Sequence, residues 1–186
     1  MLLALSLAKS TGANPKLRTR VITGMRSLPD TVRETLKLKD EILKIAPEIA
    51  SKDNALFLGR GIFYPIAKEG ALKLKEISYI HAEAYPAGEL KHGPLALIDE
   101  DMPVIALAPE SEIAEKLVSN LEEVKARGGT IYVFSDPSIK MDLKSGRLIT
   151  MPKCDFLLTP IIYTIPLQIL SYEAVSYTHL TLPTKA

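Results

Sequence analysis

The sequence contains too few cysteines and histidines to build a disulfide or a zinc site. Cys154 is the only cysteine, so no intramolecular disulfide can form. The three histidines are scattered and lack the spacing of zinc ligands; they are His81, His92 and His179. A chain that folds without disulfides is typical of a reducing compartment. We therefore expect a cytoplasmic protein that uses no metal and no cofactor.

The sequence also lacks an excess of charge of either sign and a long apolar run. Lys plus Arg total 23 and Asp plus Glu total 22, so the formal net charge is +1. No broad electrostatic field exists to attract nucleic acid or an acidic membrane surface. The apolar start, residues 1–8, is too short to span a bilayer and precedes its positive charge, unlike a signal peptide. We expect neither nucleic acid nor a membrane as a partner.

What the sequence does contain is the alternation of an α/β domain. With 186 residues, 47 % hydrophobic and 24 % charged, the chain can hold one complete domain and a fragment of another. Short apolar runs predict strands at 55–58, 103–108, 130–135 and 147–151. Helical periodicity predicts helices at 63–80 and from about Ser111 to the stop at Gly128-Gly129. Because strands and helices alternate, we predict an open parallel sheet flanked by helices.

The two ends of the chain differ from this alternating centre. Turn-forming residues at 10–15 mark a boundary after the apolar start. From Pro29 to about Ala46 apolar residues recur among charged ones, which predicts an amphipathic helix stopped by Pro47. Segment 160–175 is almost wholly apolar and predicts a helix buried against the sheet or another subunit. Residues 176–186 have no helical period and predict an extended tail.

The run Gly59-Arg60-Gly61 lies between a predicted strand and a predicted helix. Backbone amides at such a place can hold an anion such as a phosphate. Two glycines without a longer fingerprint serve a tight turn more often than a phosphate site. The sequence leaves both interpretations open, and the turn is the commoner of the two.

The helix predicted after this turn carries a ridge of charged residues. At about 100° per residue, Glu69, Lys73 and Glu76 fall on one face of the helix. Such a ridge is often only a solvated stripe of ion pairs. Here apolar residues, Ile66 and Leu72, flank the ridge, which favours a position at the wall of a cleft. A carboxylate beside a lysine in a cleft is suited to act as a general base.

A second candidate follows at the end of a short predicted helix between Pro86 and Gly93. His92 would lie in the last turn, where the helix dipole favours a protonated imidazole. That environment suits a proton donor near neutral pH. A lone histidine at this place more often serves only as a helix cap.

Four segments resemble one enzyme family closely: Leu58–Gly61, Tyr64–Ala67, residues 69–85 and Gly88–Ile98. They are similar to the isomerase part of the glutamine:fructose-6-phosphate aminotransferases (isomerizing), also called glucosamine-6-phosphate synthases. The match is dense over these segments and runs more loosely to about Val175.

The resemblance implies a flavodoxin-like α/β fold, the second of two sugar-isomerase (SIS) lobes. Residues 1–17 would then be the end of the last helix of a first lobe and the link from it. Residues 18–50 would be a connecting helical segment, 51–175 the second lobe, and 176–186 a tail atypical of the family. The family's glutaminase domain and nearly all of its first lobe would lie outside this chain.

The resemblance also assigns roles to the candidate residues. The family transfers glutamine-derived ammonia to fructose 6-phosphate and isomerises the product to glucosamine 6-phosphate. Glu76 matches the family's base, Lys73 a catalytic neighbour, and Glu69 a neighbour suited to substrate binding. His92 matches a histidine that opens the sugar ring from the adjacent subunit, which implies a homodimer.

Two departures from the family limit what this chain can do by itself. The family holds the sugar phosphate mainly with its first lobe, and its tail lysine, which forms an imine with the sugar, cannot be equated with Lys185. We therefore expect the chain alone to be inactive. Two alternatives are a non-catalytic sugar-phosphate-binding SIS module and a related SIS deglycase or isomerase. The pairing of Glu76 with His92 favours the aminotransferase.

Overall fold

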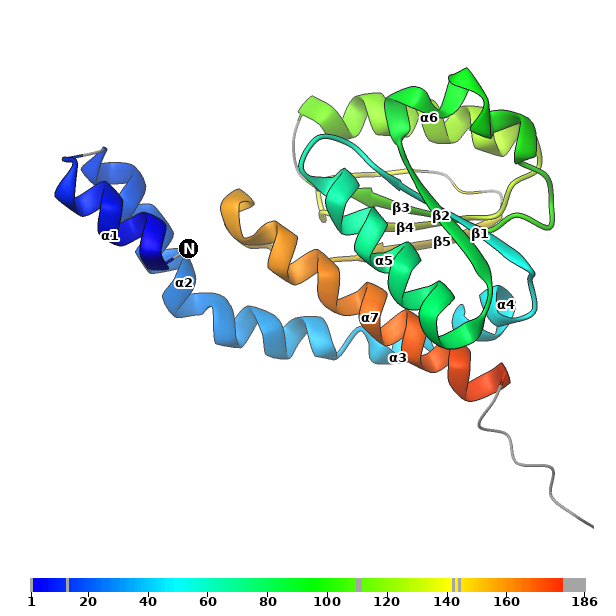
Figure 1. The fold of residues 1–186 in the computed structure, drawn as a ribbon, viewed down its shortest axis with the longest axis horizontal. Helices are drawn as coiled ribbons and strands as arrows, with labels where there is room; N and C mark the ends of the chain where they lie inside the picture. The colour runs from blue at the N-terminus through cyan, green and yellow to red at the C-terminus, as the bar shows by residue number, and fades with distance from the viewer. Residues whose placement is uncertain (1, 13, 110–111, 142, 144, 179–186) are drawn as a thin grey trace, which may run out of the picture.

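The protein folds around a five-stranded, wholly parallel sheet (Figure 1). The computed structural model describes residues 2–12, 14–109, 112–141, 143 and 145–178. The strand order is β2-β1-β3-β4-β5. The strands are β1 (Asn54–Gly59), β2 (His81–Pro86), β3 (Val104–Ala108), β4 (Ile131–Ser135) and β5 (Gly146–Thr150). This arrangement is an α/β fold, as the alternating pattern predicts.

Helices cover both faces of the sheet and create two hydrophobic cores. On one face lie α3 (Lys39–Ile42), α4 (Ala46–Ala50), α5 (Phe63–Ser78) and α7 (Thr159–Thr178). On the other lie α6 (Glu112–Ala126) and the 3₁₀ segments η1 (Ala87–His92) and η2 (Pro94–Leu97). Successive strand residues point to opposite faces, so Phe57 joins the α5 core while Leu56 and Leu58 join the α6 core.

All four predicted strands are present, but the sequence pattern misses β2. This strand pairs in parallel with β1, from Asn54 opposite His81 to Gly59 opposite Pro86. Its two alanines, its glutamate and its proline are residues that strands use rarely. Tertiary pairing with β1 overrides that weak propensity. As a strand at the sheet edge, β2 also tolerates a proline that a central strand would exclude.

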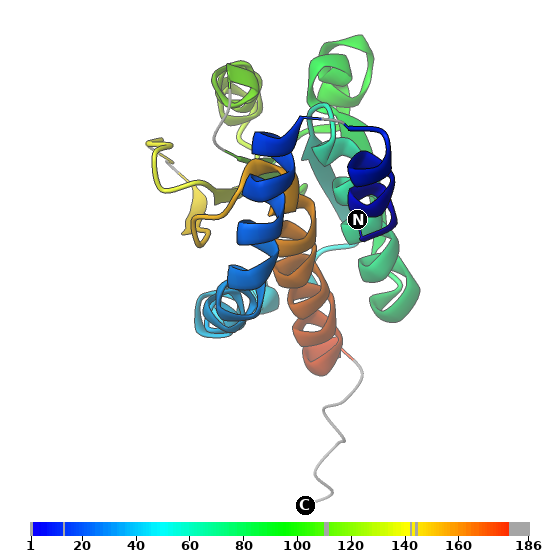
Figure 2. The same ribbon diagram turned by 90° about the vertical axis from the view of Figure 1, so that its left-hand side faces the viewer.

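The N-terminal helices correct one prediction. Helix α1 (Leu2–Ser10) is followed by α2 (Pro15–Leu36), and the two form an arm beside the rest of the fold (Figures 1 and 2). The expected helix from Pro29 to Ala46 is wrong, because α2 already begins at Pro15, where Asn14 caps its amide groups, and ends at Leu36. Pro47 opens α4 instead of stopping a helix, since proline fits the first turn.

Helix α7 is buried within the chain itself. Its side chains Ile162, Leu167 and Leu170 are fully enclosed, and the helix packs against α5 and α4. It runs to Thr178, so the first residues of the predicted tail are helical; positions 179–186 lie outside the described residues. A further 3₁₀ segment, η3 (Phe156–Leu158), precedes it. Within the described residues no helix is both long and apolar enough to cross a membrane.

Candidate active site on helix α5 and segment η1

Helix α5 begins directly after β1 because two glycines permit a tight turn. A Cβ atom on Gly59 would lie 2.2 Å from the carbonyl oxygen of Phe63, so a larger residue would push the helix away from the strand. Gly61 has a φ of +57°, a conformation that glycine adopts at little cost. Both glycines thus serve the turn that starts α5, as the commoner interpretation of the motif expects.

The predicted ridge lies on the outer face of α5. The inner face packs into the core through Phe63, Ala67, Gly70, Ala71, Leu74 and Ser78. Glu76 on the outer face is exposed, and Glu69 and Lys73 are half-buried. Exposed apolar side chains lie on this helix or at its two ends; they are Leu72, Ile62 and Tyr79. A face that mixes charged and apolar side chains is suited to contact another surface.

Lys73 and Glu76 form an ion pair on this face. The Lys73 Nζ atom donates a hydrogen bond to Glu76 Oε2 at 2.7 Å, and the two side chains are 36 % and 48 % exposed. The hydrogen bond and negative charge of Glu76 raise the pKa of Lys73, so the lysine is protonated at neutral pH. A carboxylate that is held on one side by an ammonium group and open on the other can accept a proton from a substrate.

His92 lies far from this pair within one chain. Helix α5 runs from the carboxyl end of β1 back to the amino end of β2, so Glu76 lies near the amino end of the sheet. The exposed His92 ends segment η1, which follows β2 and turns back beside α6, because the neighbouring Lys91 pairs with Glu123 close to the end of α6. Segment η1 also packs on the α6 side of the sheet through Ala87 and Leu90. A single copy therefore does not bring the two candidate residues together.

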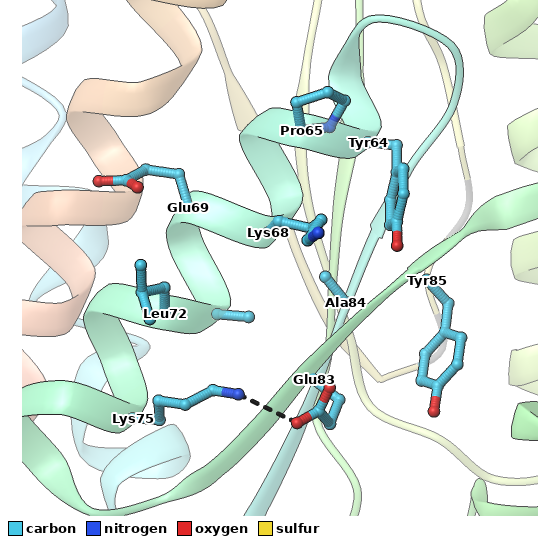
Figure 3. Close-up of a pocket in the computed structure, with 10 residues that line it drawn as sticks. Tyr64, Pro65, Lys68, Glu69, Leu72, Lys75, Glu83, Ala84 and Tyr85 are labelled. Carbon is cyan, nitrogen blue, oxygen red and sulfur yellow. Dashed lines mark hydrogen bonds and ion pairs between the residues drawn. The ribbon is translucent and has the colours of Figure 1, made fainter.

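A groove of about 640 Å³ lies between α5 and β2 (Figure 3). Its polar lining comes from Tyr64, Lys68, Glu69 and Lys75 of α5 and from Glu83 and Tyr85 of β2. Lys75 Nζ donates a hydrogen bond to Glu83 Oε1 at 3.0 Å. Of the four predicted site residues, Glu69 lines this groove, whereas Lys73, Glu76 and His92 do not.

The sequence pattern does not predict this groove, because it does not predict the strand that forms one of its walls. A signal was nevertheless present in residues 81–85. His81, Glu83 and Tyr85 alternate with alanines, which is the two-residue period of a half-exposed strand.

Other reactive groups are less suited to catalysis or metal binding. Burial, together with the charges of Asp155 and Asp136, raises the pKa of Cys154 to about 11, so its thiol is not a nucleophile at neutral pH. Within the described ranges, no three His, Cys, Asp or Glu side chains come together as a metal site would require.

Curated relatives of this chain carry the name of an aminotransferase. It is 55 % identical over 175 residues to the glutamine–fructose-6-phosphate aminotransferase [isomerizing] of Acidithiobacillus ferridurans, a match that covers 93 % of this chain and 29 % of the relative. The enzyme of the same name from Shewanella oneidensis is 53 % identical over 174 residues, with the same coverage of both chains. The chain thus spans less than a third of the length of these curated relatives.

Solved structures similar to this chain include a domain of an aminotransferase. The C-terminal domain of glucosamine-fructose-6-phosphate aminotransferase from Francisella tularensis matches with a TM-score of 0.89 and 43 % identity, over 93 % of this chain and 49 % of that chain. A glucosamine-6-phosphate deaminase from Thermotoga maritima shares the fold, with a TM-score of 0.56 and 24 % identity over 95 % of this chain and 50 % of that one. The family model of the SIS domain matches residues 48–176. The chain belongs to the SIS domain family.

Proposed function

We propose that the chain is the lobe that carries the catalytic base of a glutamine:fructose-6-phosphate aminotransferase (isomerizing). This enzyme converts fructose 6-phosphate and glutamine-derived ammonia into glucosamine 6-phosphate. The observation that carries the proposal is the Lys73–Glu76 ion pair on the outer face of α5. It is supported by the high identity to the curated aminotransferases over almost the whole chain.

The isomerisation needs a base that takes a proton from C1 of the sugar imine and returns one to C2. We assign this role to Glu76, whose carboxylate is open to an incoming substrate. Lys73 is close enough, at 2.7 Å, to fix the direction in which the carboxylate points. Glu69 lies on the same face nearer the start of α5 and is the substrate-binding candidate, suited to accept hydrogen bonds from sugar hydroxyls.

His92 opens the sugar ring in the site of a second copy of the chain. Within one copy, η1 packs on the α6 face of the sheet and α5 packs on the opposite face, which supports this arrangement. In a two-fold dimer, the face of one copy that carries His92 can lie beside the face of the other that carries Glu76. The proposed assembly is a homodimer, and light scattering at tens of micromolar protein checks it: a stable monomer would argue against His92 acting in this way.

The proposed enzyme contains parts beyond this chain. Residues 1–17 belong to the end of a first lobe and its link, and residues 18–50 form a connecting helical segment. Residues 51–175 form the second lobe, and residues 176–186 are a tail atypical of the family. The first lobe holds the sugar phosphate and the glutaminase domain releases ammonia. The coverage of only 29 % of the curated relative supports this division. The proposed enzyme acts in the cytoplasm, binds neither nucleic acid nor a membrane, and uses no cofactor.

Replacement of Glu76 tests the proposal. We consider a chimera in which this chain replaces the matching segment of the Acidithiobacillus ferridurans relative. Glu76→Gln keeps the shape of the side chain but removes the base, so isomerisation should fall by about two to four orders of magnitude while glutamine hydrolysis continues. The control is Glu115→Gln, the same change at an exposed position of α6. Near-normal formation of glucosamine 6-phosphate by Glu76→Gln would remove this residue from the role.

A further inference from the structure

We propose that Glu123 of α6 is a positioning residue for His92 and acts on it through Lys91. The inference rests on the proposed function, because it takes His92 as the group that opens the sugar ring. The His92 side chain is exposed and forms no hydrogen bond or ion pair with any residue that the structure describes. A group that transfers a proton must nevertheless be held in one direction. Its neighbours must therefore hold it.

Segment η1 is well anchored at its beginning. Ala87 and Leu90 are fully buried in the core on the α6 face of the sheet. Arg60, in the turn after β1, lies against Gly88, since a Cβ atom on this glycine would lie 3.1 Å from the Arg60 Nη1 atom. The first part of η1 is therefore fixed by packing from two sides.

The end of η1, which carries His92, lacks such packing. Lys91, His92 and Gly93 are all exposed. Gly93 has a φ of +144°, which glycine adopts at little cost, and a Cβ atom there would meet nothing within 4 Å. The chain directly after His92 is thus neither packed nor sterically restricted. The histidine must be held from its amino-terminal side, which is the side of Lys91.

One ion pair holds that side. Lys91 Nζ lies 2.7 Å from Glu123 Oε1, and among the described residues no other ion pair joins the last turn of η1 to another element. The Glu123 side chain is 29 % exposed, so water screens the pair less than it would a fully exposed one. Glu123 lies between Leu121 and Val124, which are fully buried, and therefore projects from a firmly packed part of α6.

The ion pair can direct His92 because Lys91 and His92 are consecutive residues. In the proposed dimer, His92 acts in the site of the second copy, so a small tilt of η1 moves the imidazole relative to that copy's substrate. A misplacement of about 1 Å can cost about a hundredfold in rate. A partly exposed ion pair, by contrast, contributes little to stability. Loss of Glu123 should therefore affect catalysis more than folding.

Replacement of Glu123 in the chimera described above tests the proposal. Glu123→Gln keeps the shape of the side chain but releases Lys91, so formation of glucosamine 6-phosphate should fall by about three- to tenfold. Glutamine hydrolysis and the urea midpoint of unfolding should not change. The matched control is Glu122→Gln, the adjacent carboxylate, whose partner Lys125 lies in α6 itself. Equal rates in Glu123→Gln and Glu122→Gln overturn the inference.

Two combined variants separate positioning from a general disturbance. The exchange of Lys91→Glu with Glu123→Lys rebuilds the pair in the opposite order and should bring the rate back to within about threefold of the unmutated chimera. In a His92→Gln background, Glu123→Gln should change the residual rate by less than about twofold, because no imidazole is left to position. Equal losses in both backgrounds, or an exchange no more active than its single changes, would contradict the proposal.

Nuclear magnetic resonance of the chain labelled with ¹⁵N-histidine measures the contact without any reaction. Glu123→Gln should shift or broaden the ring signals of His92 and leave those of His81 unchanged, whereas Glu122→Gln should change neither. If the His92 signals ignore Glu123→Gln, the inference fails and the proposed function stands. If a His92→Gln chimera forms glucosamine 6-phosphate at the normal rate, the role proposed for His92 fails, and the inference fails with it.

Discussion

The two faces of the sheet carry different halves of the proposed active site. Glu76 and its partner Lys73 lie on α5, which packs on one face. His92 lies in the last turn of η1, which packs on the opposite face beside α6. The sheet thus separates the two residues within one copy. Under the proposed function, each copy therefore supplies parts of two half-sites instead of one whole site.

The two faces also differ in how firmly they hold the candidate residue. Helix α5 is anchored by a whole buried face, so Glu76 stands on a rigid element. Segment η1 is a short 3₁₀ helix held by two buried side chains, Ala87 and Leu90, and by the ion pair of Lys91 with Glu123. A base must keep its direction to within a small angle, whereas a group that reaches into a second subunit must fit that subunit's surface. The difference in anchoring agrees with these two tasks.

If the proposed active site is divided between two copies and further parts of the enzyme, this chain alone does not catalyse the reaction. We predict that the 186-residue chain, given fructose 6-phosphate and ammonium, makes no glucosamine 6-phosphate, because catalysis by positioning fails when nothing holds the sugar phosphate. Mass spectrometry of the reaction mixture checks this, with the chimera described above as the positive control. Turnover by the short chain at a rate comparable to the chimera would show that the phosphate-binding parts are not missing.

The anchoring of α5 can be measured by the same change on its two faces. Leu74→Ala removes a fully buried side chain and should lower the free energy of unfolding by about 2–5 kcal/mol. Leu72→Ala, at a side chain that is 42 % exposed, should cost less than about 1 kcal/mol. Urea unfolding followed by circular dichroism measures both. Equal losses would mean that α5 is not held by its inner face.

A smaller effect is expected at Tyr132, whose hydroxyl group donates a hydrogen bond to Glu48 at 2.6 Å and ties β4 to α4 near the amino end of the sheet. Tyr132→Phe should cost about 1 kcal/mol at neutral pH. Burial, helped by Glu48, raises the pKa of Tyr132, so its hydroxyl ionises more readily in the unfolded chain than in the folded one.

The stability that this shift provides is fully present below the unfolded pKa of about 10 and is lost as the pH rises above it. Unfolding measured between pH 8 and about 11 should therefore show a decline that is shallower in Tyr132→Phe. Parallel curves for the two proteins would contradict the assignment.

Much of this architecture follows from sequence periodicity, and the exceptions have physical causes. The runs at β1, β3 and β4 are buried on both faces and therefore read clearly as strands. Strand β2 does not, because its alanines and glutamate belong to an exposed edge. The ridge on α5 is visible from residue spacing alone. That Glu76 and His92 lie on opposite faces of the sheet is not, because it depends on the undetected strand β2, which leads the chain from α5 to η1.

Subunit complementation tests the central claim most directly. Glu76→Gln and His92→Gln chimeras are each nearly inactive under the proposal, and they are mixed under conditions that allow subunits to exchange. If each site takes its base from one subunit and its histidine from the other, half of the dimers are mixed and each of those regains one intact site. The mixture should then recover about a quarter of the unmutated activity. A mixture no more active than its components, while exchange is shown to be complete, would contradict a site shared between two copies.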